Sequence, residues 1–193
     1  TLWHSSAASD VYKRQAIFIS GRGSNLESLI QSSFTKQSLV EVQLVVSNNS
    51  KAKGLTIAKK NKIPFIHFIP RKNFESKVMK YLKNIDIICL AGFMQVLDSK
   101  FVIQWRSRLI NIHPSYLPAF KGLNAQDQAI KAKASYSGCS VHYVSAKIDS
   151  GKIILQKKVK ILKKDNTESL SKKILIEEHK VYPRALQLSL IHI

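Results

Sequence analysis

An amide and an imidazole occur two residues apart in an extended segment of the chain, at Asn111 and His113. Because successive residues of a strand point to opposite sides, these two side chains point to the same side. Pro114 follows and turns the chain out of the sheet, so the pair lies at the carboxyl end of a strand, where open α/β sheets bind ligands. An amide beside an imidazole can stabilise an oxygen that gains negative charge. The alternative is an ordinary structural loop around His-Pro.

Two more polar residues lie near short strands later in the chain. Asp149 precedes Ser150 and Gly151, and a carboxylate at such a turn can orient an imidazole and raise its pKa. An ordinary hairpin-turn aspartate is the alternative. His142 lies in a predicted strand, and its position fits a site residue and a packed strand histidine equally well.

A glycine-rich turn, Gly21-Arg22-Gly23-Ser24-Asn25, follows the first predicted strand. A turn of this kind at a helix N-terminus presents backbone N–H groups and the positive end of the helix dipole, and therefore favours phosphate. Ser24 and Asn25 can both cap the helix and donate to the phosphate. The turn is not a dinucleotide fingerprint, because Leu26 stands where the third glycine would be, and no Gly-Lys-Ser/Thr of a P-loop follows. A tight strand-to-helix turn with a cap is the structural alternative.

The elements that would position these residues alternate through the first half of the chain. Apolar runs predict strands at 16–20, 42–47, 65–67 and 85–91, and amphipathic patterns predict helices at 25–30, 53–61 and 74–83. This alternation predicts a mostly parallel, twisted sheet with helices on both faces, which is a Rossmann-like α/β fold.

The second half of the chain has a different pattern. The predicted strands at 140–144 and 152–156 are joined by a link too short for a parallel crossover, so we expect them to be antiparallel. A final helix is expected over 167–181, with Thr167 as its N-cap. We expect a single domain over residues 16–187, truncated at its C-terminal end, with a non-native leader at 1–15 and a non-native tail at 188–193.

The formal net charge of +19 makes nucleic acid the first partner to consider. The lysines are scattered, however, and form no basic block with interleaved aromatic residues. We therefore expect anionic small molecules as partners, and neither nucleic acid nor a membrane. No apolar run reaches the roughly 20 residues of a membrane span, and there is no signal peptide, so a cytoplasmic location is expected.

Several other kinds of chemistry find no support in the sequence. The two cysteines, Cys89 and Cys139, lie in apolar surroundings outside any CxxC pair and are expected to be buried, reduced thiols. None of the six histidines pairs with a cysteine or another histidine at a ligand spacing, so no metal is expected. The GxSxG motif of a serine nucleophile is also absent.

Taken together, these segments closely resemble the folate-dependent formyltransferase family that acts on phosphoribosylglycinamide. The resemblance covers residues 16–186 and rests on the segments ISGRGSNLESLI, VVSNNSKAKGL, IICLAGFMQVL, LINIHPSYLPAFKGL, GCSVHYVSAKIDSGKIILQ and EEHKVYP. It implies a formyltransferase fold with one antiparallel strand. It also implies direct transfer of the formyl group of 10-formyltetrahydrofolate, the co-substrate, to the amine of phosphoribosylglycinamide in purine synthesis, by a monomer or weak homodimer.

The resemblance also implies roles for residues at matching positions. Asn111, His113 and Asp149 match a catalytic trio, in which Asn111 and a protonated His113 stabilise the formyl oxygen while Asp149 keeps His113 charged. His142 would contact the trio and not the substrate. The residues expected to bind phosphoribosylglycinamide are Gly23, Ser24, Asn25 and Glu178, the first three at its phosphate and the last at its ribose.

The folate-binding residues implied in the same way are Arg71, Met94, Gln95, Val96, Leu97 and Asn111. Two positions depart from the family pattern: Gln95 replaces a common arginine, and Asn124 stands where a histidine is frequent. Because backbone groups are expected to bind the pterin there, we expect glutamine at position 95 to change folate binding little.

Three alternative functions remain at this stage. Formyltetrahydrofolate hydrolase and methionyl-tRNA formyltransferase share this domain, but each normally carries a further domain that we do not expect here, and neither is expected to have the GxGSN turn. The third alternative is a basic, non-catalytic RNA-binding module in which the glycine-rich turn is only structural.

Overall fold

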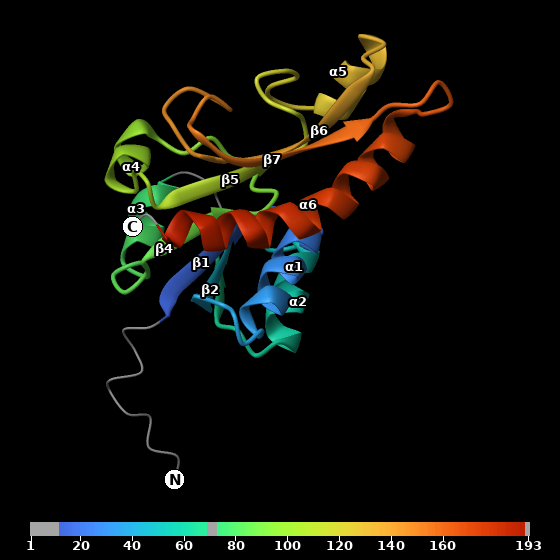
Figure 1. Cartoon of the computed structure of the whole chain (residues 1–193). Helices are drawn as coiled ribbons and strands as arrows, with labels where there is room; N and C mark the ends of the chain where they lie inside the picture. Colours follow the sequence, from blue (N-terminus) through green and yellow to red (C-terminus); the bar gives the residue numbers. More distant parts are fainter. Residues whose placement is uncertain (1–11, 69–72, 192–193) are drawn as a thin grey trace. The chain divides into compact units, whose positions relative to one another are not determined.

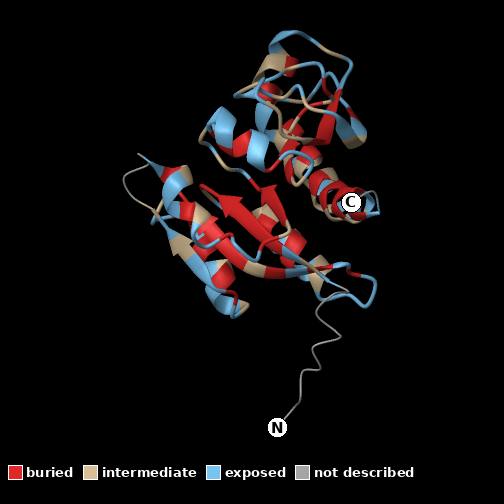
Figure 2. Ribbon diagram, turned by 90° about the vertical axis from the view of Figure 1, so that its left-hand side faces the viewer, coloured by how far each residue is buried: buried red, intermediate tan, exposed pale blue. Residues whose placement is uncertain are grey.

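The computed structural model of the protein describes residues 12–68 and 73–191. The chain forms two compact units, one up to Gln95 and one from Val96. In both units the buried residues lie mainly on the strands and on the inner sides of the helices (Figure 2). Among the described helices, none is long and apolar enough to cross a membrane.

The first unit alternates strands and helices (Figure 1). Its elements are β1 (Lys13–Ile19), α1 (Ser24–Ser33), β2 (Val40–Ser47), α2 (Lys53–Lys60), β3 (Phe65–His67), α3 (Phe74–Met79) and β4 (Ile87–Leu90). The strands are hydrogen-bonded in the order β3-β2-β1-β4, and every pair is parallel. The parallel α/β pattern predicted from the sequence is therefore confirmed for this unit.

Helices cover both faces of β1, as two adjacent residues demonstrate. The Phe18 ring meets the Phe74 ring of α3 edge-on, with the ring centroids 5.7 Å apart. The next residue, Ile19, contacts the start of α2 at Gly54. Since neighbouring strand residues point to opposite faces, α3 and α2 lie on opposite sides of the strand.

The first strand begins three residues before the predicted domain boundary at residue 16. Lys13, Arg14 and Gln15 all belong to β1, and Gln15 is fully buried. Its Nε2 donates to the Sγ of Cys89 over 2.9 Å, and Arg14 forms an ion pair with Asp86 over 3.0 Å. Residues 13–15, expected to belong to a non-native leader, are thus part of β1, and the two neighbours Arg14 and Gln15 both contact residues far along the chain.

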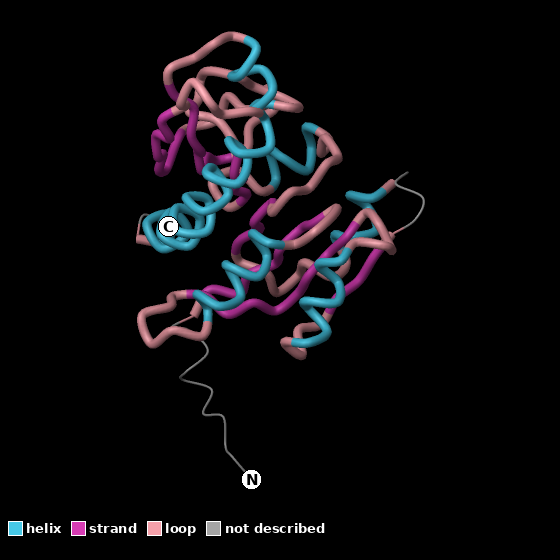
Figure 3. Tube along the Cα trace, turned by 90° about the vertical axis from the view of Figure 1, so that its right-hand side faces the viewer, coloured by secondary structure: helices cyan, strands magenta, loops and turns pink. Residues whose placement is uncertain are grey.

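The second unit has one strand that runs against its neighbours. Its elements are α4 (Ser99–Gln104), β5 (Leu109–His113), α5 (Ala125–Lys131), β6 (Tyr136–Tyr143), β7 (Ile153–Lys160) and α6 (Thr167–Leu190). β6 is antiparallel to both β5 and β7, which confirms the antiparallel pair expected from the short link. Helix α6, which leads to the C-terminus in Figure 3, packs against all three strands and α5.

The last helix differs from its prediction at both ends. Its N-cap is Asn166 and not Thr167, and Asn166 forms a reciprocal capping box with Ser169. The helix also continues through Pro183 to Leu190, although an internal proline removes a hydrogen bond and costs about 3 kcal/mol. Residues 188–190, expected to be a non-native tail, are thus part of α6, and burial of hydrophobic residues on both sides of the proline offsets its cost.

The turn from β1 into α1 fits closely against α2 and yields a prediction for stability. Gly23 has φ of +84°, and a Cβ added there would lie 2.6 Å from the Cα of Gly54. A left-handed backbone costs an alanine roughly 1–2 kcal/mol, and overpacking costs about 1–3 kcal/mol. We expect Gly23→Ala to lower the free energy of unfolding in urea by about 2–5 kcal/mol.

Gly21→Ala is the matched control, because nothing lies within 4 Å of a Cβ built at Gly21. It should change the unfolding free energy by less than about 0.5 kcal/mol. Equal effects of the two substitutions would show that the packing of Gly23 on Gly54 does not stabilise this turn.

Candidate active site

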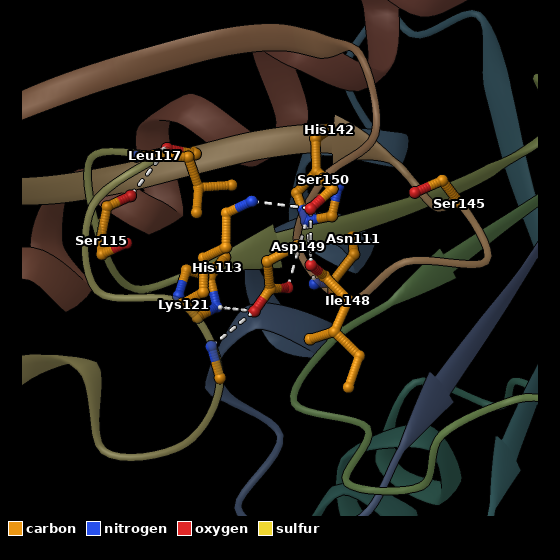
Figure 4. A network of polar contacts seen from close by, with 12 residues as sticks. Asn111, His113, Ser115, Leu117, Lys121, His142, Ser145, Ile148, Asp149 and Ser150 are labelled. Carbon is orange, nitrogen blue, oxygen red and sulfur yellow. Dashed lines mark hydrogen bonds and ion pairs between the residues drawn. The ribbon is translucent and has the colours of Figure 1, made fainter.

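Four polar side chains of the second unit converge at the carboxyl end of β5. Asn111 and His113 come from β5, His142 from β6, and Asp149 from the turn between β6 and β7 (Figure 4). The Nδ1 of His113 lies 3.3 Å from Oδ2 of Asp149, and their side chains are only 6% and 10% exposed. The sequence-predicted trio is therefore brought together, with His142 beside it.

Both ring nitrogens of His113 face oxygen atoms. Its Nε2 lies 2.8 Å from the carbonyl oxygen of Phe120, and because a carbonyl can only accept, this nitrogen carries a proton. Its Nδ1 faces the Asp149 carboxylate, so a doubly protonated ring would satisfy both acceptors. Burial opposes that charge and lowers the pKa of His113 below its ordinary value, although the Phe120 carbonyl and the Asp149 carboxylate act in the opposite direction.

The sequence led us to expect that Asp149 keeps His113 protonated. Asp149 does raise the pKa of His113, but burial of the imidazolium lowers that pKa by more. The carboxylate thus acts in the expected direction, and burial opposes it.

The carboxylate of Asp149 is held in its ionised form by its surroundings. Burial alone would raise its pKa, but the His142 side chain, the backbone N–H of Gly122 and the nearby His113 outweigh burial and lower it. The Gly122 N–H donates to Oδ2 over 2.8 Å. The site therefore contains a stable anion beside the His113 ring.

His142 connects the amide and the carboxylate. Its Nδ1 lies 2.9 Å from the carbonyl oxygen of Tyr143 and must donate to it. The other nitrogen, Nε2, faces the Nδ2 of Asn111 at 3.3 Å and Oδ1 of Asp149 at 3.6 Å. His142 is 2% exposed, so it is a packed histidine that also belongs to the polar cluster.

The turn that carries Asp149 requires a glycine. Asp149 adopts a left-handed backbone with φ of 46°. A Cβ at Gly151 would lie only 1.7 Å from the carbonyl oxygen of Tyr143, so no other residue fits without moving the backbone. The glycine of the Asp-Ser-Gly sequence thus lets the backbone pack directly against the end of β6. This packing places the Asp149 carboxylate beside His142.

Two backbone groups that contact the cluster, the Phe120 carbonyl and the Gly122 N–H, were not expected from the sequence. Both lie in the segment 114–123, which joins β5 to α5. The start of this segment is held by Ser140, whose buried hydroxyl donates to the carbonyl of Ser115 over 2.7 Å and accepts from the N–H of Leu117 over 3.0 Å. No local sequence signal marks such contacts, because they depend on how the segment folds back.

The glycine-rich turn belongs to the first unit and begins α1. The N-cap residue is Gly23, in a left-handed conformation, and it has no side chain that could cap the helix. Ser24 and Asn25, which were expected as caps, therefore lie after the N-cap position, in the first turn of the helix. The helix has ten residues, and its N-terminus still presents backbone N–H groups and the positive end of the dipole, as a phosphate site requires.

The remaining predicted site residues have varied surroundings. Glu178 of α6 is 6% exposed. The carboxamide oxygen of Gln95 lies 3.5 Å from Nδ2 of Asn48, at the end of the first unit. Met94 and Val96 are exposed and Leu97 is buried, whereas Arg71 lies outside the described residues.

Asn124 is the left-handed N-cap residue of α5, and its side chain makes no capping bond.

Within the described ranges, no group of three histidine, cysteine or acidic side chains is arranged to hold a metal ion. The cluster itself combines an amide donor, two imidazoles and a carboxylate. These groups can move a proton and stabilise a developing oxyanion.

Comparison with known protein families identifies one clear similarity. The formyl transferase family profile matches residues 13–186. A phosphoribosylglycinamide formyltransferase of Haemophilus influenzae is 36% identical over 91% of this chain and 86% of its own length. The trifunctional purine biosynthetic protein adenosine-3 of Bos taurus is 43% identical over 91% of this chain, which spans only 18% of that protein.

Solved structures give the same result. The crystal structure of phosphoribosylglycinamide formyltransferase from Anaplasma phagocytophilum has a TM-score of 0.87 and 45% identity, over 90% of this chain and 84% of that one. The enzyme of the same name from Brucella melitensis has a TM-score of 0.86 and 37% identity, over 91% and 94% of the two chains. The formyltransferase fold expected from the sequence is confirmed by these similarities.

The balance of effects on His113 leads to a prediction about its titration. We expect the pKa of His113, followed by the NMR shift of its ring C–H, to lie below 6.5. Asp149→Asn should lower it further, because the carboxylate favours the imidazolium. Asp127→Asn removes the same charge from an exposed pair with Lys131 and should leave the titration unchanged. A pKa that rises in Asp149→Asn would contradict this view of the pair.

Proposed function

The chain belongs to the formyl transferase family, and on that premise we propose that it transfers the formyl group of 10-formyltetrahydrofolate to the amine of phosphoribosylglycinamide. This is a step of de novo purine synthesis. Support for this substrate pair comes from the bacterial relative, which the chain matches over 86% of that protein's length. The observation that carries the chemical proposal is the buried contact between His113 and Asp149 beside Asn111.

The reaction forms a bond from the substrate amine to the formyl carbon and breaks the bond from that carbon to N10 of the folate. One proton moves from the amine to N10, and negative charge develops on the formyl oxygen. A carboxamide has two N–H groups, and His142 engages the Nδ2 of Asn111. We assign the other N–H to the developing oxyanion, and one such donor is typically worth about 2.7–4 kcal/mol of barrier.

Asp149 is the group that we assign to proton transfer. Its carboxylate is kept ionised, so it can accept, through a water, the proton that the attacking amine loses and return it to the leaving nitrogen. When the His113 ring is protonated, it is held between two acceptors, the Asp149 carboxylate and the Phe120 carbonyl. Asp149 thus favours the charged ring, which adds a positive charge next to Asn111, where the oxyanion develops.

The other residues keep the roles expected from the family resemblance. We propose that Gly23, Ser24 and Asn25 bind the substrate phosphate, since a helix N-terminus favours an anion. Glu178 would accept hydrogen bonds from the ribose hydroxyls. The segment 94–97 would line the pterin pocket of the folate, and it contributes mainly through its backbone.

The remaining parts of the proposal concern partners and location. We propose a cytoplasmic enzyme with small-molecule substrates, acting as a monomer or weak homodimer. Cys89 and Cys139 are both buried and neither forms a disulfide, as suits a reducing compartment. Burial, followed by the nearby Glu178 and Glu177, raises the pKa of the Cys139 thiol to about 12, so this thiol stays protonated at neutral pH.

The proposal predicts the outcome of a spectrophotometric assay of tetrahydrofolate formation. The wild-type protein should produce it only when phosphoribosylglycinamide is present. Asp149→Asn should lower kcat about 10²- to 10⁴-fold, because general acid–base catalysis contributes a factor of this size. The KM for phosphoribosylglycinamide should change little, since its phosphate is assigned to the Gly23–Asn25 turn.

Asp127→Asn again serves as the control and should keep wild-type kcat. Folate product that forms equally fast without the ribonucleotide would identify a formyltetrahydrofolate hydrolase instead. Near-normal turnover of Asp149→Asn would remove Asp149 from the mechanism.

A further inference from the structure

The contact between Asp149 and Gly122 uses one half of a single peptide group. The N–H of Gly122 donates to Oδ2 of Asp149 over 2.8 Å. The carbonyl of the same peptide belongs to Lys121 and accepts a hydrogen bond from Nε2 of Gln128 over 2.9 Å. Because a peptide group is planar and trans, its C=O and N–H point in opposite directions, and fixing one fixes the other.

Gln128 holds the backbone on both sides of Gly122. The same Nε2 also donates to the carbonyl of Leu123 over 2.8 Å. Both N–H groups of the carboxamide are thus used on the two carbonyls that flank Gly122. Since a carbonyl can only accept, the orientation of the amide is fixed by its partners.

The residue comes from a rigid element outside the segment that it holds. Gln128 lies in α5, whereas Lys121 and Leu123 belong to the segment 114–123. Gly122 itself has φ of +75° and therefore a backbone with wide conformational freedom. A glycine at this position needs an external contact if its N–H is to keep one direction.

We propose that Gln128 is a positioning residue for the reaction, acting on Asp149 and His113 through the Lys121–Gly122 peptide. A hydrogen bond to the carbonyl polarises the peptide and strengthens its N–H as a donor. The Gly122 N–H in turn stabilises the ionised form of Asp149, the form that stabilises a protonated His113. This inference rests on the proposed function only for its effect on catalysis.

The test compares two glutamines of the same helix. Gln126 also lies in α5, and the structure records no side-chain hydrogen bond for it among the residues it describes. The variants are Gln128→Ala, Gln128→Glu, Gln126→Ala and Gln126→Glu. Alanine and glutamate both favour a helix, so all four are expected to fold. Glutamate keeps the shape of glutamine but, when ionised, cannot donate.

The first readout is the NMR titration of the Gly122 amide proton, which needs no activity. In the wild type this proton should lie downfield and report the protonation of Asp149. In both Gln128 variants it should move upfield, and the pKa of Asp149 should rise. Both Gln126 variants should match the wild type.

The second readout is steady-state kinetics in the formyl transfer assay. The Gln128 variants should lose about three- to tenfold in kcat, as expected for one hydrogen bond, with nearly unchanged KM values. Lack of activity in the wild type would refute the proposed function and leave the titration as a valid test of the contact. If Gln128→Ala matches Gln126→Ala in both readouts, or Gln128→Glu matches the wild type, the inference is overturned.

Discussion

The contact between the imidazole of His113 and the carboxylate of Asp149 is the constraint on which the site depends. Two ionisable groups that are 6% and 10% exposed can carry charge only if hydrogen bonds replace the lost water. The protein supplies the Phe120 carbonyl to one ring nitrogen and the Gly122 N–H to one carboxylate oxygen. These contacts keep the carboxylate ionised and offer a protonated imidazole two acceptors, which suits a site that moves a proton.

Strand register places the other half of the cluster. In the antiparallel ladder between β5 and β6, Asn111 stands opposite His142 and His113 stands opposite Ser140. A slip by one residue would move each side chain to the other face of the strands, and the contact from Asn111 to His142 would be lost. The same register puts Ser140 under the segment that follows His113, where its hydroxyl holds Ser115 and Leu117. Catalytic and structural polar groups thus depend on one strand pairing.

The sequence predicted the repeating pattern of the first unit well, because buried parallel strands are continuous apolar runs and the helices between them are amphipathic. The strand at 65–67 was located correctly, and the other strand and helix boundaries differed by a few residues. The helices at Ser99–Gln104 and Ala125–Lys131 were not predicted, since neither shows a clear apolar period. The long extension of α6 was missed because Pro183 and the apolar end of the chain were interpreted by local rules.

The sequence by itself determined which residues can act: an amide and an imidazole on one side of a strand, a carboxylate at a glycine turn, and a glycine-rich helix start. These follow from the two-residue period of a strand and from the conformational freedom of glycine, both of which are local properties. Only the tertiary structure decided the direction of the His113 pKa shift, because burial and the Phe120 carbonyl arise from segments that meet by folding. The same holds for the Gly122 N–H on Asp149 and for Gln128 behind it, since the direction of a backbone group depends on contacts distant in the chain.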